Sequence, residues 1–362
     1  MKILFFGPYP KPFTGQSVAF KEIYDNFTST KVLCDTTKFE DSKVLNSLYV
    51  FVILPFLFIT KKITKVYFTC SRSKLGFIKD FYLIIFSQIF SVKLINHLHG
   101  GDFRMFSENS SYLFKKLIYW SYKKVDTSIV LTKEMVSQFN DYDTMKVEVV
   151  PNCYAKSFLD VTWSELQNTY KQSISLIYFS NIMSTKGIMT FLDALEPVLE
   201  KYPKITVDIA GVPIGDYLLD KNQITKVFKD KLKELKRKFG TRISYHGLVS
   251  GNLKETYLKK SSIFVLPTVH RSEAFPISII EAMYFGNAII TTDLNYLPGI
   301  VKNKSNGILI KPNDSVGLEE ALNVLLDDKE FLNAMQKTNY QDARVKYNPD
   351  KIFNSIDKII RE

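Results

Sequence analysis

The chain has 362 residues, of which 46% are hydrophobic and 23% are charged. This length favours two domains of about 150 to 180 residues, and this composition excludes an intrinsically disordered protein. The formal net charge of +11 fits an anionic ligand, an anionic membrane or a nucleic acid as partner, without choosing among them. Three widely separated cysteines indicate neither a disulfide framework nor a zinc site, so we expect a cytoplasmic protein.

Strand and helix patterns alternate in the first 150 residues. Strands are predicted at 2–7, 65–71, 92–100, 127–132 and 147–152, and helices at 17–27, 75–90, 112–122 and from Lys133. This alternation is typical of a parallel sheet built from βαβ units. We therefore expect a Rossmann-like domain over residues 1–160.

Two apolar stretches of this half could lie in one leaflet of a membrane. Residues 44–60 are uncharged, but they contain Asn46 and a central Pro55, and 17 residues fall short of the roughly 20 that a spanning helix needs. Residues 81–92 are flanked by lysines. Apolar segments with basic neighbours bind anionic membrane surfaces, although two core helices fit the pattern equally well.

Doubly wound sheets bind ligands where their strands end, so the residues just after the strands are the candidates. Gly15 lies in the loop GPYPKPFTGQS after the first strand, where glycine lets the backbone approach a ligand. His97 and His99 would share one face of a strand, which could suggest a metal site. Because His246 and His270 are the only other histidines and no cysteine is close, we expect no metal there.

The alternation restarts after a polar stretch at residues 155–172. Strands are predicted at 174–180, 204–211, 242–247, 261–267, 287–292 and 307–312, and helices at 188–201, 224–239, 253–260, 277–285 and 315–326. We expect a second Rossmann-like domain over residues 173–345. A helix over residues 348–362 has an apolar face that needs a surface to cover.

Two stretches of this second half could hold the same diphosphate from two sides. Lys186 stands at the start of a helix, where an ammonium and free N–H groups can hold a diphosphate. In PTVHRSEAFPISIIEAMYFG, residues 267–286, Glu273 lies in a loop and Glu281 lies inside the following helix. A helix N-terminus between two such carboxylates suits a nucleotide sugar, because the carboxylates can accept from the hydroxyls of the sugar and the ribose.

Several of these stretches resemble one family. EAFPISIIEAM is similar to the E-x7-E signature of the retaining GT-B glycosyltransferases of family four. NHLHGG is similar to the histidine motif of that family, which it matches at His99. Lys186 and Gly187 match the end of its G-R-x4-K-G pattern, in which Asn181 replaces the arginine. The resemblance covers nearly the whole chain and is strongest over residues 174–326.

The resemblance implies a GT-B fold, an α/β architecture of two Rossmann-like doubly wound parallel-sheet domains that face one another across a cleft. It implies a metal-independent, retaining transfer of a sugar from a UDP- or GDP-sugar. His99 and Glu273 would be catalytic, with both contacting the donor sugar. The implied donor-binding residues are Gly15, Lys186, Gly247, Val249, Phe275, Pro276, Ile277 and Glu281, of which Lys186 holds the diphosphate and Glu281 the ribose.

The basic first half favours a lipid-linked glycan as acceptor, met at the anionic cytoplasmic face of the inner membrane. The expected setting is the assembly of a bacterial capsule, lipopolysaccharide O-antigen or exopolysaccharide. We expect no cofactor, because the D-x-D motif Asp141–Asp143 lies in a polar turn and not at a metal-diphosphate site. A nucleotide-sugar 2-epimerase of GT-B fold and a basic nucleic-acid-binding protein are the alternatives, and we prefer the transferase.

Overall fold

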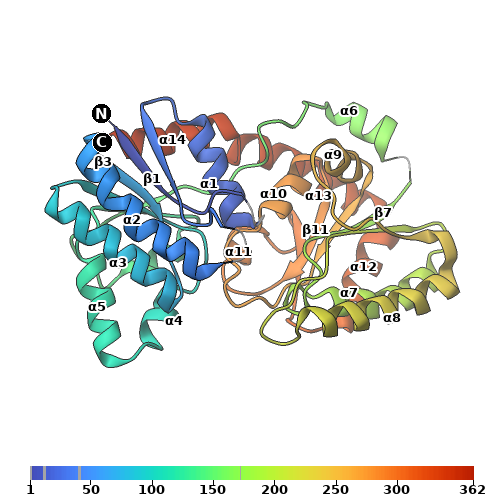
Figure 1. Cartoon of the computed structure of the whole chain (residues 1–362). Coiled ribbons are helices and arrows are strands. Elements are labelled where there is room, and N and C mark those ends of the chain that lie inside the picture. Colours follow the sequence, from blue (N-terminus) through green and yellow to red (C-terminus); the bar gives the residue numbers. More distant parts are fainter. Residues whose placement is uncertain (1, 11–13, 40–41, 172) are drawn as a thin grey trace. The chain divides into compact units, whose positions relative to one another are not determined.

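The computed structural model describes residues 2–10, 14–39, 42–171 and 173–362, and it divides into two compact units (Figure 1). Unit 1 comprises Met1–Asn152 and Asp350–Glu362, and unit 2 comprises Cys153–Pro349. Among the described residues each unit contains one six-stranded sheet, and every strand pair is parallel. The predicted α/β fold of two Rossmann-like domains is thereby confirmed.

Unit 1 is built on the strand order β2-β1-β3-β4-β5-β6. Its strands are β1 (Ile3–Gly7), β2 (Lys31–Asp35), β3 (Lys65–Thr69), β4 (Lys93–Leu98), β5 (Thr127–Val130) and β6 (Lys146–Val149). Its helices are α1 (Gly15–Asn26), α2 (Lys43–Lys61), α3 (Lys74–Ile89), α4 (Phe103–Glu108), α5 (Tyr112–Tyr122), the 3-10 helix η1 (Glu134–Phe139) and α14 (Pro349–Arg361). Right-handed crossovers place α1 on one face of the sheet and α2, α3 and α5 on the other.

The C-terminal helix α14 is attached to unit 1 through its end. The amino groups of Lys65 and Lys93, at the starts of β3 and β4, donate to the carbonyls of Arg361 and Glu362 at 2.5 and 3.2 Å. The Arg361 guanidinium also donates to Thr28 Oγ1 at 2.7 Å. The apolar face of the helix, which includes Ile356, is buried. These contacts explain why residues far apart in the sequence belong to one unit.

Unit 2 has the strand order β12-β11-β10-β7-β8-β9. Its strands are β7 (Ser175–Phe179), β8 (Thr206–Ala210), β9 (Ile243–Tyr245), β10 (Ile263–Leu266), β11 (Ala288–Thr292) and β12 (Gly307–Ile310). Its α-helices are α6 (Trp163–Glu165), α7 (Ile188–Lys201), α8 (Lys221–Phe239), α9 (Gly251–Lys260), α10 (Ile277–Tyr284), α11 (Leu297–Ile300), α12 (Ser315–Asp327) and α13 (Lys329–Lys346). Short turns of other helix types are the π-helix η2 (Leu166–Tyr170) and the 3-10 helices η3 (Ser184–Lys186) and η4 (Gly240–Arg242).

The structure contains elements that the sequence analysis did not predict, namely the edge strand β2 and the helices α4, α11 and α13. The helix expected from Lys133 is the 3-10 helix η1. The polar stretch 155–172 contains short helical turns. Every other predicted strand and helix is present, with ends that agree within a few residues.

Candidate functional site

The strand order of unit 2 places a topological switch point between β7 and β10. The chain leaves β7 through α7 toward β8, whereas it leaves β10 through α10 toward β11 on the opposite side. Open parallel sheets bind their ligands at such a switch point, outside the carboxyl ends of the two strands. The loop after β7 carries Lys186, and the loop after β10 carries Glu273. Two residues that are 87 positions apart in the sequence are thus placed side by side.

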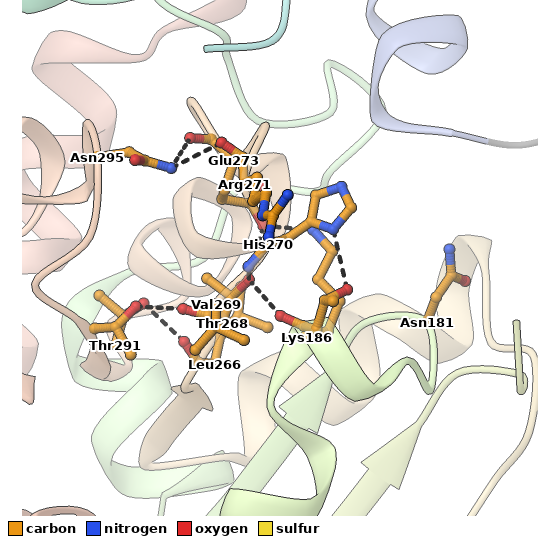
Figure 2. Close-up of polar contacts among 12 residues, drawn as sticks. Asn181, Lys186, Leu266, Thr268, Val269, His270, Arg271, Glu273, Thr291 and Asn295 are labelled. Atoms are coloured by element: carbon orange, nitrogen blue, oxygen red, sulfur yellow. Dashed lines mark hydrogen bonds and ion pairs between the residues drawn. The ribbon is translucent and has the colours of Figure 1, made fainter. Parts of the chain in front are cut away.

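Lys186 and Glu273 form an ion pair through Nζ and Oε2, and only 18% and 9% of the two side chains are exposed. The hydroxyl of Thr268 lies 3.2 Å from the same carboxylate oxygen. Figure 2 shows these side chains gathered between the two loops, with Asn181 standing apart from the dashed contacts. An ammonium and a carboxylate held together at a strand end can bind a phosphate and a sugar hydroxyl, respectively.

Backbone contacts hold the two loops against each other. The Val269 N–H donates to the carbonyl of Thr185 at 2.7 Å, and Thr185 Oγ1 lies 3.0 Å from His270 Nδ1. Gly187 adopts a φ of +75°, and a Cβ at this residue would lie 1.9 Å from the carbonyl oxygen of Pro267. Only glycine fits such a close approach of two backbones, so the Lys186 loop depends on it.

The helix α10 begins where the Glu273 loop ends. Pro276 occupies its N-cap position, Ile277 is its first residue, and no side chain caps its N-terminus. Phe275 is buried beside it, and Gly286 ends the helix region with a φ of +61°. A proline can stand at such a helix start without the loss of a hydrogen bond. The observed start of α10 confirms the predicted junction between loop and helix.

Glu281 lies inside α10 and is only 4% exposed. Its Oε1 is 2.5 Å from Nζ of Lys254, which comes from α9. Buried carboxylates need such a partner, because an unpaired charge would be costly inside the protein. The carboxylate that the resemblance assigns to the ribose is therefore held in place by a lysine that the sequence analysis did not single out.

The loop after β9 lies on the other side of β7. Gly247 has a φ of +64°, and its carbonyl accepts from the N–H of Gly211 at 2.7 Å. Val249 is 9% exposed and lies in the segment just before α9. His246 is bound on both ring nitrogens, by Asp208 at 2.7 Å and by the hydroxyl of Tyr257 at 3.0 Å. This loop is thus rigidly supported, and its roles at a nucleotide remain predictions.

Gly15 and His99 belong to unit 1. Gly15 is the first residue of α1, and nothing in the described chain lies within 4 Å of where its Cβ would be. The adjoining residues 11–13 of the predicted glycine loop lie outside the described residues. His99 follows β4, and both of its ring nitrogens are buried without a hydrogen-bond partner among the described residues. Burial and the charge of Arg72 lower the pKa of His99 to about 3, so its imidazole is neutral at pH 7.

Four residues near the site were missed by the sequence analysis, namely Thr268, Lys254, Arg271 and Asn295. Asn295 Nδ2 donates to the carbonyls of Arg271 and Glu273 at 3.1 and 3.4 Å and so holds the Glu273 loop from α11's side (Figure 2). The Arg271 guanidinium lies 4.8 Å from the ring centre of Tyr217. Local patterns did not reveal Lys254, Arg271 and Asn295, because contacts between separate segments of the chain place them.

Among the described residues, no group of three or more His, Cys, Asp or Glu side chains could hold a metal ion. The residues Asp141–Asp143 lie in a turn before β6. One helix, α2, is long and apolar enough to cross a membrane by length and composition.

Two solved structures share the fold of the whole chain. Anabaena HepE in complex with UDP superposes with a TM-score of 0.77 at 16% identity and covers 100% of both chains. Sucrose-phosphate synthase from Thermosynechococcus elongatus gives a TM-score of 0.75 at 14% identity, over 99% of this chain and 98% of the other. At such identities the likeness concerns the fold alone.

Relatives by sequence carry glycosyltransferase names. An uncharacterized glycosyltransferase of Methanocaldococcus jannaschii is 26% identical over 65% of this chain, and the match spans 58% of that relative's length. An Escherichia coli protein is 26% identical over 74% of this chain and 67% of its own length. It is named UDP-Gal:alpha-D-GlcNAc-diphosphoundecaprenol alpha-1,3-galactosyltransferase.

The family model of the glycosyl transferases group 1 matches residues 162–342, which are half of the chain. This range contains β7 to β12 and therefore the switch point, Lys186 with Glu273, and Lys254 with Glu281. With its fold, its paired carboxylates and this match, the chain belongs to the glycosyl transferases group 1 family.

Proposed function

We propose that the chain transfers a sugar from a nucleoside diphosphate sugar, a UDP- or GDP-sugar, to a hydroxyl group with retention of the anomeric configuration. The observation that carries the proposal is the pairing of Lys186 with Glu273 at the carboxyl ends of β7 and β10. Membership in the glycosyl transferases group 1 family supports it. So do the neighbours in fold, since Anabaena HepE was crystallised with UDP and with UDP-glucose.

In this proposal one ion pair, Lys186 with Glu273, binds the sugar diphosphate end of the donor, and the other, Lys254 with Glu281, binds its ribose. A diphosphate draws the Lys186 ammonium toward itself, which frees the carboxylate of Glu273 to accept from the sugar hydroxyls. Glu281, held beside Lys254, accepts from the ribose hydroxyls. His99 contributes a neutral imidazole toward the sugar.

Transfer itself needs positioning and charge stabilisation more than a strong base. The bond between the anomeric carbon and the diphosphate oxygen breaks, and the acceptor oxygen bonds to the anomeric carbon on the same face. The acceptor proton passes to the departing diphosphate, whose growing negative charge Lys186 stabilises. No cofactor and no metal enters this scheme.

For the acceptor we propose a lipid-linked glycan at the cytoplasmic face of the inner membrane. Two relatives support this choice by their names, the Escherichia coli galactosyltransferase and a Campylobacter jejuni N,N'-diacetylbacillosaminyl-diphospho-undecaprenol alpha-1,3-N-acetylgalactosaminyltransferase. The Campylobacter protein is 33% identical over 24% of this chain and 22% of its own length. The setting would be assembly of a capsule, O-antigen or exopolysaccharide.

Arg271 supplies the second cation in this proposal. The family pattern places an arginine where this chain has Asn181. Arg271 lies next to His270 in the Glu273 loop, and its guanidinium stacks over Tyr217 without a carboxylate partner in the part of the chain that the structure describes. Lys186 and Lys254 each pair with a glutamate, so Arg271 is a cation of this loop that can join Lys186 at the diphosphate.

A thermal-shift panel of UDP- and GDP-sugars tests the site. At about 100 times Kd a ligand stabilises the folded protein by about 2.7 kcal/mol, which shifts the melting of a domain of this size by several degrees. We expect one nucleotide class to shift the wild type and to lose that shift in Glu281→Ala. Glu255→Ala is the matched control, because Glu255 is also buried, at 8% exposed, and pairs at 2.6 Å with Lys259, which is not a predicted site residue. Equal shifts in wild type and Glu281→Ala would contradict the proposal.

With the donor so identified, product analysis tests the reaction. Proton NMR of the glycoside formed on a polyprenyl diphosphate sugar acceptor should show the anomeric configuration of the donor. The inverted configuration would refute retention, and turnover of the nucleotide sugar to its 2-epimer without acceptor would identify an epimerase instead.

The role of Arg271 has its own test. Arg271→Ala should weaken binding of the nucleoside diphosphate about tenfold, the loss of one charge-assisted hydrogen bond, and leave binding of the free nucleoside unchanged. Titration calorimetry with both ligands measures this difference. Arg237→Ala removes the same charge from the exposed face of α8 and should change neither affinity. An equal loss for nucleoside and diphosphate would mean that Arg271 only supports the loop.

A further inference from the structure

The helix α2 exposes an apolar stripe. Val44, Leu48, Val52 and Phe56 follow one another at intervals of four residues and, with Ile59, are 53 to 75% exposed. The opposite side of the helix buries Asn46, Val50, Leu54, Leu57 and Phe58 in unit 1. Core helices of soluble domains normally turn polar residues outward, so this helix has two apolar sides, one of which is not covered by the chain that the structure describes.

The neighbouring helices extend this surface. Tyr82 of α3 donates its hydroxyl to the carbonyl of Phe51 at 3.0 Å, which joins α3 to α2. Phe81 of α3 and Trp120 of α5 have ring centres 6.0 Å apart, which joins α3 to α5. Figure 1 shows α2, α3 and α5 as neighbouring helices of unit 1. On α5, Tyr112, Leu113 and Trp120 are 70%, 77% and 47% exposed. We call the exposed side chains of α2, α3 and α5 the α2–α5 face.

The charges of the α2–α5 face are all positive. The three helices contain one acidic residue, Asp80, which is 1% exposed and accepts hydrogen bonds from Ser71 and Tyr122. Exposed lysines lie at both ends of α2, at the start of α3, and on and after α5, at positions 43, 61, 62, 74, 115, 116, 123 and 124. Three of the lysines on and after α5 lie over exposed aromatic rings, Lys116 over Tyr112 at 4.3 Å, Lys123 over Tyr119 at 6.0 Å and Lys124 over Trp120 at 5.8 Å.

We propose that the α2–α5 face docks on an anionic lipid bilayer, with α2 lying in the plane of the membrane interface. Apolar side chains that enter the acyl boundary, tyrosine and tryptophan at headgroup depth, and lysines that reach anionic headgroups are the features of an interfacial helix. This placement extends to α5, whose contribution the sequence analysis did not anticipate. Residues 81–92, the second apolar stretch of the sequence analysis, contribute less to this surface than α2, because Leu83, Ile84 and Ser87 are buried.

The structure argues against two alternatives, a second copy of the chain on this face and an α2 that spans the membrane. A second copy of the chain would bring two lysine-rimmed surfaces together with no exposed carboxylate on either to pair with them. A membrane-spanning α2 would have to leave the unit, exposing its five buried residues and breaking the two hydrogen bonds, 2.8 and 2.9 Å, between the Asn46 amide and the backbone of Phe39. An anionic bilayer surface meets neither obstacle.

Vesicle sedimentation of the full-length protein tests the proposal. We expect binding to phosphatidylcholine vesicles that contain phosphatidylglycerol, and at least about tenfold weaker binding of Val52→Glu/Phe56→Glu. The matched control is Val316→Glu/Val345→Glu, which adds the same charges at positions of unit 2 that are 64% and 63% exposed. Wild-type binding by the α2 variant, or equal losses in both variants, would overturn the proposal.

Two further measurements separate lipid binding from its alternatives. Gln in place of Lys115, Lys116, Lys123 and Lys124 should weaken binding to the anionic vesicles, each lysine being worth up to about fivefold, and lower its salt dependence. In Trp163→Phe the single remaining tryptophan is Trp120. Its fluorescence should shift to the blue on anionic vesicles and be quenched by brominated lipid. An unchanged Trp120 spectrum on bound protein would overturn the role of α5.

Self-association gives a distinct result. If Val52→Glu/Phe56→Glu converted a dimer to a monomer in light scattering while vesicle binding persisted, the face would be a protein interface and the proposal would be wrong. The proposal does not depend on the glycosyl-transfer proposal. Nucleotide-induced thermal shifts of the α2 variant should equal those of the wild type, so each proposal can fail alone.

Discussion

Among single residues, Asp80 shows how burial and hydrogen bonding compete at one carboxyl group. It is 1% exposed on α3 and accepts from the N–H and hydroxyl of Ser71 at 2.8 and 3.0 Å, and from the hydroxyl of Tyr122 at 3.1 Å. Burial raises the pKa of Asp80 to about 7, although these hydrogen bonds and the charge of Lys79 oppose the rise. The native state therefore keeps a proton that the unfolded state releases near pH 4.

This difference predicts the pH dependence of stability. Between about pH 4 and 7 the native state binds more protons than the unfolded state, so the free energy of unfolding falls as pH rises, by up to about 1.4 kcal/mol per unit. Above pH 7 the contribution is constant. Asp80→Asn should therefore gain stability relative to wild type between pH 5 and pH 8. Urea unfolding at both pH values measures this gain, and an identical difference at the two would contradict the pKa shift.

On the scale of elements, the site depends on two short loops whose backbones touch. The loop from β7 reaches α7 through Gly187, and the loop from β10 reaches α10 through Pro276. Since Gly187 lies against the carbonyl of Pro267, the position of Lys186 depends on the position of the Glu273 loop. The ion pair between the two residues is thus set by backbone packing and not only by attraction between charges.

A pair of glycine variants distinguishes a steric clash with the carbonyl of Pro267 from backbone strain alone. Gly187→Ala should cost more than about 2 kcal/mol of stability and weaken nucleotide binding at least tenfold, because the new Cβ must displace the Glu273 loop. Gly240 has a φ of +59° with nothing within 4 Å of its Cβ position. Its ψ of −130° lies outside the left-handed helical region, so Gly240→Ala should cost about 1 to 3 kcal/mol through backbone strain alone and leave binding intact. Equal effects in chemical unfolding and nucleotide titration would mean that the contact with Pro267 does not matter.

On the scale of the whole molecule, the chain returns to unit 1 after completing unit 2. The helix α14 buries Ile352, Phe353, Ile356 and Ile360, and it is bonded at its end to the starts of β3 and β4. Each such side chain stabilises by about 1.5 to 3 kcal/mol, a sum comparable to the total stability of a domain. Unit 1 therefore cannot be complete before residues 350–362 are made.

Truncation after Asn348 should remove the unfolding transition of unit 1 and keep that of unit 2, together with its shift by nucleotide. Differential scanning calorimetry and limited proteolysis show both. Ile356→Asp should reproduce the loss, whereas Lys358→Asp, at an exposed position of the same helix, should not. Loss of both transitions on truncation would mean that the two units do not unfold separately.

The amino-acid sequence alone determined the alternation of strands and helices, because hydrophobic period, glycine and proline act over a few residues. It predicted the Glu273 loop, Pro276 at the helix start and Gly286 at its end for that reason. It did not reveal α13, whose buried side includes Gln336 and Asn339. These amides donate to the carbonyls of Ser262, Asn287 and Asn306, so the helix lacks a clear apolar stripe.

Only the tertiary structure decided which charges meet. Lys186 reaches Glu273 because β7 and β10 are neighbours in the sheet, although two strands separate them in the chain. Lys254 reaches Glu281 because the fold brings α9 to α10. It also decided which side of α2 is covered, since a helix with two apolar sides carries no local signal for the side that packs inward. Contacts of this kind depend on strand order, and strand order is a property of the whole sheet.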